Sequence, residues 1–357
     1  MRKIVTIVGA RPQFVKAAVV SKAICEQNIF EEIIIHTGQH FDPNMSDIFF
    51  VQMGIPKPNY NLNINNLGHG AMTGQMLEKI EEVLVIEKPE LVIVYGDTNS
   101  TLAGALAAKK MHIKVAHIEA GLRSFNMKMP EEVNRILTDR ISDYLFCPTD
   151  TAVLNLQKEG FSNFPVSIVK SGDVMQDAAM FFSQFAEKPS FELPEKFALA
   201  TIHRAENTDS TLNLESIFSA FNVIANELSI IIPLHPRTAA ILKRNVELKL
   251  SKNILLVEPV GYLQMLYLLK TCSMVFTDSG GLQKEAFFFQ KPCITLRNET
   301  EWVELVESKV NIIANTNISS IYNAFNHFKN THINYDIDLY GNGKASDCIV
   351  KSLVNTF

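Results

Sequence analysis

Short runs of β-branched and other apolar residues alternate with segments of helical periodicity along almost the whole chain. The runs are KIVTIVG, EEIIIHTG, ELVIVYGD, VAHIEAG and DYLFCPT in the first half, and FALATIH, SIIIPLHP, NILLVEP, SMVFTDSG and PCITLR in the second. Continuous apolar strands separated by helices are typical of parallel sheets that helices cover on both faces. The sequence therefore predicts an α/β fold with two doubly wound, Rossmann-like domains.

The length of the chain also favours two domains. A single hydrophobic core usually stops growing below 357 residues. We place the first domain at residues 1–170 and the second at 171–343, with the boundary near Ser171-Gly172-Asp173.

Charge and cysteine usage exclude several classes of protein. A net charge of -5 argues against a nucleic-acid partner, because nucleic-acid binding proteins carry clustered basic surfaces. The five cysteines are odd in number and scattered, which disfavours a disulfide framework and a zinc site and fits a reducing cytoplasm. No run approaches the roughly 20 apolar residues of a membrane-spanning helix. We therefore expect a cytoplasmic protein with no membrane and no metal.

A glycine-rich turn follows one strand of the second half. In Ser279-Gly280-Gly281 the glycines permit close backbone approach, and the next segment, LQKEAFFF, is expected to form a helix whose first amides could receive a phosphate. Glu285 then falls one turn into that helix, where it could reach ribose hydroxyls. The alternative is an ordinary strand-to-helix turn without a ligand.

Basic residues follow the first strand. Pro12 suits an early helical position, and Arg11 and Lys16 could supply positive charge beside the helix start. The segment lacks the G-x-G-x-x-G pattern of dinucleotide-binding proteins, which argues against hydride transfer. A solvated basic pair is the structural alternative.

Acidic residues at strand ends are the more unusual feature. Asp97, Glu119 and the Glu131/Glu132 pair have no Cys or His spacing suited to a metal, and paired carboxylates suggest proton transfer. Asp97 could instead cap a helix, and Glu131 could form an exposed ion pair with Arg135, four residues further on.

Two histidines end strands of the second half. His203, in HRAEN, is flanked by charged residues and is the candidate for contact with a phosphate leaving group. For His235, in PLHPRT, we favour a packed or hydrogen-bonded loop position.

The motifs GARPQFVK, GDTNSTLAGALAA, HIEAGLRS, MPEEVNR, HRAEN and TDSGG-x-Q-x-E together resemble the non-hydrolysing UDP-N-acetylglucosamine 2-epimerase family, and they span residues 9 to about 304. The resemblance implies two domains of the glycogen phosphorylase (GT-B) type with the ligand in the interdomain cleft. It also implies a C-terminal helix, residues 344–357, that packs back on the first domain.

The resemblance assigns roles to single residues. It matches Asp97, Glu119 and Glu131 to the family's catalytic acids and His203 to its catalytic histidine. The substrate-binding positions that it implies are Arg11, Lys16, Arg135, Ser279, Gly280, Gly281, Glu285 and Arg297. The family chemistry expels UDP by anti elimination, forms a glycal and returns UDP after reprotonation on the opposite face, with no metal or redox cofactor. A homodimer that feeds polysaccharide assembly, O-antigen included, is expected on the same ground.

Two segments of the second half predict which UDP-sugar the protein binds. EAFFFQKPCITLRNETEWVELV and LYGNGKAS resemble the branch that acts on UDP-2,3-diacetamido-2,3-dideoxy-glucuronate, whereas UDP-N-acetylglucosamine enzymes more often carry EAPSLGKPVL and TERPE. The extra carboxylate of that sugar needs a cationic partner, and Arg123, Lys128 and Arg297 are the candidates. UDP-N-acetylglucosamine is the alternative substrate. The alternative functions are a glycosyltransferase of the same architecture, a hydrolysing epimerase and a non-catalytic nucleotide-sugar sensor.

Overall fold

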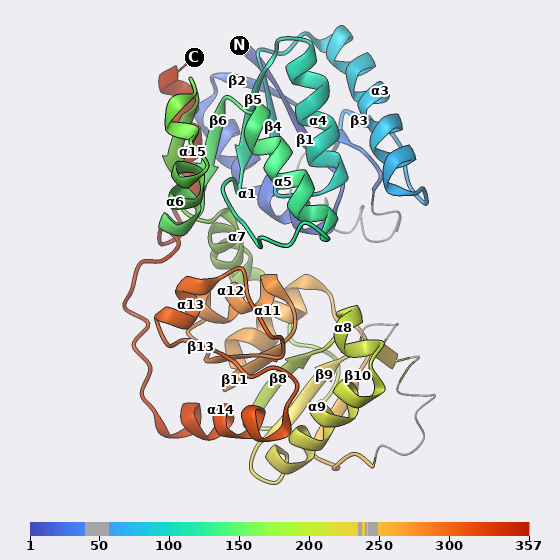
Figure 1. The fold of residues 1–357 in the computed structure, drawn as a ribbon, viewed down its shortest axis with the longest axis vertical. Coiled ribbons are helices and arrows are strands. Elements are labelled where there is room, and N and C mark those ends of the chain that lie inside the picture. The colour runs from blue at the N-terminus through green and yellow to red at the C-terminus, as the bar shows by residue number, and fades with distance from the viewer. Residues whose placement is uncertain (40–56, 235–237, 240, 242–248, 357) are drawn as a thin grey trace. The chain divides into compact units, whose positions relative to one another are not determined.

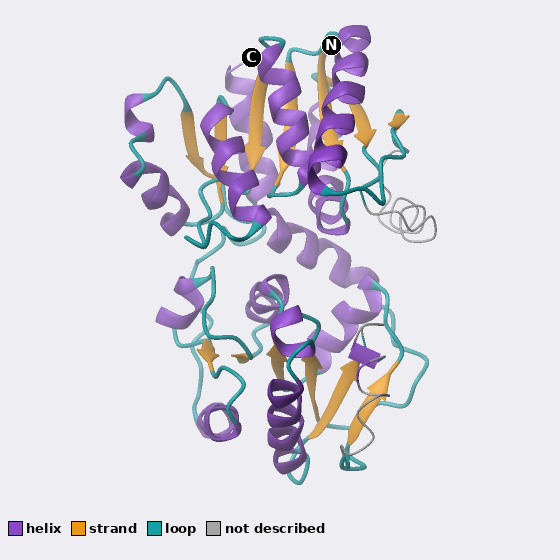
Figure 2. Ribbon diagram, turned by 45° about the vertical axis from the view of Figure 1, so that its right-hand side comes forward, coloured by secondary structure: helices purple, strands orange, loops and turns teal. Residues whose placement is uncertain are grey.

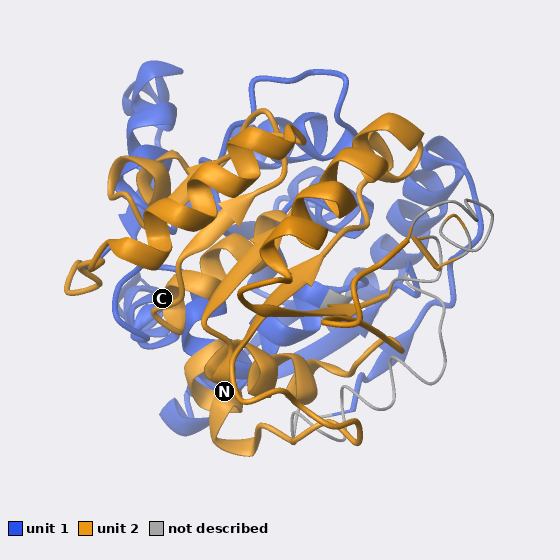
Figure 3. Cartoon of the chain, turned by 90° about the horizontal axis from the view of Figure 1, so that it is seen from below, with its two compact units in different colours: residues 1–178, 338–357 blue, residues 179–337 orange. Residues whose placement is uncertain are grey.

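The chain divides into two compact units (Figure 3). The computed structural model describes residues 1–39, 57–234, 238–239, 241 and 249–356, with the side chain of Arg11 excepted. Unit 1 comprises residues 1–178 and 338–357, and unit 2 comprises residues 179–337. The predictions for His235 and for the Arg11 side chain lie outside the described residues.

Unit 1 is built on a seven-stranded sheet in which every pairing is parallel (Figure 1). In spatial order its strands are β3 (Tyr60–Asn61), β2 (Phe30–His36), β1 (Arg2–Val8), β4 (Leu91–Tyr95), β5 (Lys114–Ile118), β6 (Tyr144–Cys147) and β7 (Ser167–Lys170). All five residues of β4 are buried, as expected for a central strand covered on both faces. The strand order reverses between β1 and β4.

Helices cover the sheet of unit 1 (Figure 2). They are α1 (Arg11–Gln27), α3 (His69–Glu87), α4 (Asn99–Lys110), α5 (Pro130–Ile141), α6 (Asp150–Lys158), η1 (Phe161–Asn163), the first half of α7 (Val174–Phe182) and α15 (Ala345–Thr356). Alanines and Gly104 bring α4 close to the strands, because a Cβ at Gly104 would lie 2.6 Å from Ile7 Cδ1. The carboxylate of Asp177 accepts hydrogen bonds from the amides of Ala345 and Ser346, and α15 packs against α1.

Unit 2 repeats the plan with six parallel strands. Their spatial order is β10 (Ile254–Val257), β9 (Ser229–Pro233), β8 (Phe197–Thr201), β11 (Met274–Thr277), β12 (Cys293–Thr295) and β13 (Asn311–Ile313). The helices are η2 (Ser183–Phe185), α8 (Ala205–Thr208), α9 (Thr211–Ile224), α11 (Tyr262–Thr271), α12 (Gly280–Phe288), α13 (Val303–Glu307) and α14 (Ile318–Asn330). The strand order reverses between β8 and β11.

Two cores sandwich the sheet of unit 2, one on each face. Ala198 and Ala200 of β8 pack into a cluster with α9 and α14, whereas Phe197 and Leu199 pack into a second cluster with α11 and α12. Successive side chains of a strand point to opposite faces, so both sets of apolar residues are needed. This explains why β8 reads as a continuous apolar run.

Candidate active site

In both sheets the strand order reverses between two central strands, β1 and β4 in unit 1 and β8 and β11 in unit 2. The candidate site residues that the sequence predicts follow these strands. In unit 1, α1 begins after β1 and carries Lys16, and Asp97 follows β4. In unit 2, His203 follows β8 and Ser279 follows β11. Ligands of open parallel sheets bind at this switch point, beyond the carboxyl ends of the strands.

Glu119 occupies a strained turn after β5. Its φ of 72° lies in the left-handed region that non-glycine residues rarely adopt, and such strain tends to occur at functional sites. Its Oε2 atom lies 2.5 Å from Lys16 Nζ, and both side chains are at most 10% exposed. A Cβ at Gly96 would lie 3.4 Å from Lys16 Nζ and 3.8 Å from Glu119 Oε1. The ion pair is therefore held beside the turn that leads to Asp97.

Asp97 is the second carboxylate of this cluster. Thr98, not Asp97, caps α4, because its side chain accepts the hydrogen bond from the Thr101 amide. Asp97 Oδ2 instead lies 2.5 Å from Arg135 Nη2. Burial raises the pKa of Asp97, and the negative charge of Glu119 raises it further, against opposing effects of Arg135 and Lys16. A carboxyl group with a raised pKa is suited to proton transfer near neutral pH.

The two neighbouring glutamates of α5 differ in their surroundings. Glu131 is exposed in the first turn of the helix, whereas the side chain of Glu132 is fully buried. Glu132 accepts hydrogen bonds from the amides of Ser124 and Phe125 at 2.9 and 2.8 Å, and its Oε2 lies 2.7 Å from Arg135 Nη1. Arg135 therefore bridges Asp97 and Glu132 inside the protein, and the proposed exposed pair with Glu131 is not its main contact.

Asp278 organises the turn after β8 in unit 2. It is fully buried and accepts hydrogen bonds from the amides of His203 and Arg204 and from Asn207 Nδ2, each within 3.1 Å. The His203 Nδ1 atom lies 3.3 Å from Asp278 Oδ1, and 42% of the histidine side chain is exposed. The histidine is thus held at its backbone while much of its ring stays accessible.

The start of α12 combines a capped helix with two different glycines. Ser279 is the N-cap, and its side chain accepts a hydrogen bond from the Leu282 amide. A Cβ at Gly280 would lie 2.1 Å from Glu301 Oε1, so a larger residue here would displace the Glu301 carboxylate. At Gly281 an added Cβ would meet nothing within 4 Å. The first turn of α12 therefore faces open space at Gly281, where an anion could approach the helix amides.

Arg297 lies beside the same helix start. It is buried, and its Nη1 lies 2.9 Å from Glu301 Oε2. Its Nε is a buried donor without a hydrogen-bond acceptor among the residues that the structure describes. Burial raises the pKa of Glu301, but the charges of Arg297 and Arg204 outweigh burial and hold it below its ordinary value. Glu285 is buried on the same helix.

Sequence reasoning missed the roles of Asp278 and Glu301. The apolar run SMVFTDSG places Asp278 at a strand end, just before Ser279, but its contacts with the amides of His203 and Arg204 depend on the pairing of β8 with β11. Glu301 belongs to the loop between β12 and α13, and no periodicity in the sequence places it beside Gly280.

One sequence prediction for this region is wrong. Arg123 was a candidate partner for a sugar carboxylate, but its guanidinium contacts Asp139 at 2.7 Å and Glu159 at 2.6 Å and its side chain is 1% exposed. These two carboxylates already occupy its donors. Lys128 is exposed and, with Arg297, remains a candidate.

In the part of the chain that the structure describes, no three His, Cys, Asp or Glu side chains gather as a metal would require. No helix in that part has the length and apolar character needed to cross a membrane.

A comparison of the sequence with protein families identifies the family. Residues 22–354 match the family described as UDP-N-acetylglucosamine 2-epimerase. The chain belongs to this epimerase family.

Individual members of the family cover the chain almost completely. The UDP-2,3-diacetamido-2,3-dideoxy-D-glucuronate 2-epimerase of Pseudomonas aeruginosa is 56% identical, over 98% of this chain and 99% of that protein. A UDP-N-acetylglucosamine 2-epimerase homolog of Methanococcus maripaludis is 52% identical over 99% of both proteins. The crystal structure of Methanocaldococcus jannaschii UDP-GlcNAc 2-epimerase in complex with UDP-GlcNAc and UDP superposes with a TM-score of 0.88, at 43% identity and 99% coverage of both chains.

These findings confirm three predictions. The resemblance to the epimerase family, the α/β fold with two doubly wound units and the assignment to the UDP-sugar epimerases are all correct. The roles of single residues in this epimerase stay predictions, which the geometry above makes specific.

Proposed function

We propose that this epimerase inverts carbon 2 of UDP-2,3-diacetamido-2,3-dideoxy-D-glucuronate. The reaction type rests on one observation: two carboxylates, Asp97 and Glu119, follow adjacent parallel strands, and each is paired with its own cation. The substrate rests on the 56% identity to the P. aeruginosa enzyme that carries this name. The loop segments of the second half support the same branch.

The proposed reaction is an elimination followed by an addition. One group removes the proton from carbon 2 while the bond from carbon 1 to the UDP oxygen breaks and UDP leaves with the electron pair. A glycal forms between carbons 1 and 2. A second group then protonates carbon 2 on the opposite face, and UDP returns to carbon 1. The sequence of steps is redox-neutral and needs acid–base groups on two faces of the sugar.

The residues divide between these tasks. Asp97, Glu119 and Glu131 carry out proton transfer, and the Lys16 ammonium beside Glu119 compensates its negative charge. Arg11 and Arg135 add positive charge on the same unit. The groups proposed to hold the nucleotide and its diphosphate are His203, Ser279, Gly280, Gly281, Glu285 and Arg297. Preorganised donors of this kind stabilise the charge that develops on a leaving diphosphate.

The C6 carboxylate of the proposed sugar needs a cation that internal pairs leave available. Lys128 meets this requirement best, since Arg123 is enclosed and Arg297 already pairs with Glu301. Lys128→Gln should lower kcat/KM for the uronate substrate and leave that for UDP-N-acetylglucosamine unchanged. Lys110→Gln, at an exposed position in the last turn of α4, is the matched control.

Proton NMR of the enzyme with each UDP-sugar in heavy water tests the proposed function. We expect deuterium at carbon 2 of the product, traces of UDP and glycal, and a higher kcat/KM for the diacetamido-uronate. A preference for UDP-N-acetylglucosamine would overturn the substrate and leave the reaction intact. Retention of the original proton, release of the free 2-epimerised sugar, or transfer to an added acceptor would overturn the reaction itself.

We also propose that the enzyme works in the cytoplasm as a homodimer and supplies polysaccharide assembly, O-antigen among the candidates. All five cysteines are free thiols, and Cys147, Cys272 and Cys293 are buried, which suits a reducing compartment. Sedimentation equilibrium should give twice the mass of 40.0 kDa, and a monomer would contradict the dimer.

A further inference from the structure

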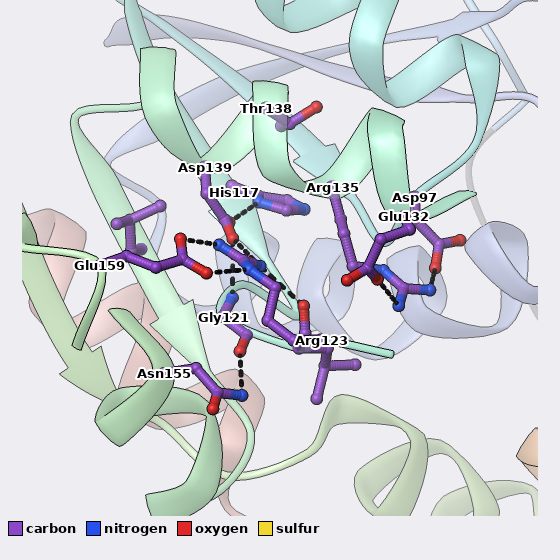
Figure 4. Close-up of polar contacts among 12 residues, drawn as sticks. Asp97, His117, Gly121, Arg123, Glu132, Arg135, Thr138, Asp139, Asn155 and Glu159 are labelled. Carbon is purple, nitrogen blue, oxygen red and sulfur yellow. Dashed lines mark hydrogen bonds and ion pairs between the residues drawn. The ribbon is translucent and has the colours of Figure 1, made fainter. Parts of the chain in front are cut away.

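A chain of charged side chains lies beside Asp97 and Arg135 in unit 1 and runs from His117 to Glu159 (Figure 4). His117 of β5 and Asp139 of α5 are both fully buried, with His117 Nδ1 at 2.7 Å from Asp139 Oδ1. Arg123 continues the chain from Asp139 Oδ2 to Glu159, which it binds through two hydrogen bonds of 2.6 and 2.8 Å. None of these four residues has a role in the chemistry proposed above.

The hydrogen bonds define the protonation of His117. Its Nε2 lies 2.7 Å from the carbonyl oxygen of Gly96, which can only accept, so Nε2 carries a hydrogen. Its Nδ1 faces a carboxylate oxygen of Asp139. The other carboxylate oxygen of Asp139 already accepts hydrogen bonds from the Gly121 amide and from Arg123 Nη1. One proton therefore lies between His117 Nδ1 and Asp139 Oδ1 and joins the two side chains.

The His117 ring joins the two turns that carry Asp97 and Glu119. Through Nε2 it binds the carbonyl of Gly96, the residue before Asp97, and it precedes Glu119 by two residues on β5. The Gly96 amide in turn donates to the Ile118 carbonyl at 2.9 Å. Glu119 is a non-glycine residue with positive φ, so its turn needs contacts that hold it in place.

Asp139 anchors the same assembly from the other side. Its Oδ2 accepts a 3.1 Å hydrogen bond from the Gly121 amide, two residues after Glu119, in addition to the 2.7 Å bond from Arg123. Glu159 neutralises Arg123 at the partly exposed end of the chain. The carboxylates of Asp139 and Glu159 thus both pair with Arg123, so each of these charged groups has a partner, as a buried ionic cluster requires.

We propose that His117, which bridges the Gly96 carbonyl and Asp139, is a positioning residue that sets the separation of the catalytic carboxylates Asp97 and Glu119. The proposal rests on the proposed function, because positioning matters only if these carboxylates transfer protons. His117 does not contact the sugar. It acts on kcat through geometry, and a displacement of about 1 Å can cost about 100-fold in rate.

Two amide variants separate the two hydrogen bonds of His117. In His117→Gln the side-chain nitrogen can reach the position of Nε2 and keep the bond to Gly96, whereas in His117→Asn it can reach only the position of Nδ1 and keeps the bond to Asp139. We expect kcat to fall about 10-fold in His117→Gln and about 100-fold in His117→Asn, with KM within about threefold of wild type in both. Equal kcat values, or an effect on KM alone, would overturn the proposal.

Glu159→Gln is the matched control in the same network. It weakens the ion pair at the far end, where 34% of the side chain is exposed, and leaves the bonds of His117 in place. We expect a lower Tm and an unchanged kcat. If Glu159→Gln lowers kcat as much as His117→Asn does, the network supports folding in general and His117 has no special positioning role.

Histidine NMR tests the bond between His117 and Gly96 without any variant or activity. In protein labelled with 15N in histidine, Nε2 of His117 should carry a proton, assigned through its contacts with the Gly96 backbone. A ring with no proton on Nε2 would overturn the proposal even if both variants fail to fold. Turnover of the wild-type enzyme is measured first, so that the proposed function and the role of His117 are tested separately. An inactive wild type would refute the proposed function, whereas the NMR result reports on His117 alone.

Discussion

In unit 1, the polar groups beside the reversal in strand order are charged side chains that neutralise one another, whereas in unit 2 they are mainly backbone amides and a helix start. Lys16 faces Glu119 and Arg135 faces Asp97 within unit 1. In unit 2, Asp278 binds the backbone at His203, and the first turn of α12 presents Gly281 to open space. Both units use the same topology, at β1/β4 and at β8/β11.

The difference shows what each site is suited to do. Carboxylates with adjacent cations can hold and release protons, because small changes in their surroundings shift their pKa values. Amides and arginines at a helix start cannot release protons near neutral pH, but they can bind an anion. We therefore expect changes in unit 1 to act mainly on kcat and changes in unit 2 mainly on ligand affinity.

The largest expected effect comes from the carboxylates of unit 1. Asp97→Asn and Glu119→Gln should each lower kcat by about 100-fold to 10,000-fold, the range of general acid–base groups. UDP affinity, measured by calorimetry, should change little, since the nucleotide is assigned to unit 2. Near wild-type rates in both variants would mean that these carboxylates are structural and that the comparison of the two units fails.

The neighbouring glutamates of α5 sharpen the comparison within unit 1. Glu131→Gln should lower kcat by about 100-fold without a loss of stability, because Glu131 is exposed. Glu132→Gln should instead lower the free energy of unfolding by about 3 kcal/mol, since it breaks a buried pair with Arg135. Urea unfolding measures the stability of both variants, and initial rates measure their kcat. The reverse outcome would assign the proton-transfer role to Glu132.

These glutamates also show how far sequence reasoning reaches. It identified the acidic pair but could not separate an exposed Glu131 from a buried Glu132, because that depends on how the segment containing Ser124 folds back on α5. It found ten strands and missed β3, β7 and β13, which are short and lie at sheet edges. Edge strands are partly exposed, so their residues need not be uniformly apolar and carry a weaker pattern.

The contacts of His117 could not be predicted for a related reason. Its partners are Gly96 and Asp139, 21 and 22 residues away, and they meet it because β4 and β5 are neighbours and α5 packs against β5. Sequence motifs identify residues at strand ends but do not show which ones pair. The same limit produced the wrong prediction for Arg123.

The two glycines of α12 separate packing from ligand binding in unit 2. Gly280→Ala places a methyl group against Glu301 and should lower the free energy of unfolding by about 1–3 kcal/mol, as overpacking does. Gly281→Ala meets open space and should stabilise the helix by about 0.5–1 kcal/mol. UDP affinity, measured by calorimetry, should nevertheless fall about 10-fold in Gly281→Ala, since the methyl group would crowd the proposed anion. Unchanged affinity would remove Gly281 from the nucleotide site.

The smallest expected effect is on the pH dependence of stability, to which Asp97 and Glu301 should contribute with opposite signs. The pKa of Asp97 is raised in the folded protein, so the folded state holds its proton more tightly, and the stability that this adds is lost as pH rises through the folded pKa. The pKa of Glu301 is lowered, so its contribution is present at higher pH and is lost as pH falls through the folded pKa. Urea unfolding of wild type, Asp97→Asn and Glu301→Gln across the acidic range measures both. As pH rises through this range, wild type should lose stability relative to Asp97→Asn and gain stability relative to Glu301→Gln. If both stability differences changed with pH in the same direction, the two units would hold their carboxylates in the same way. The comparison predicts opposite directions, because the pKa of Asp97 is raised on folding and the pKa of Glu301 is lowered.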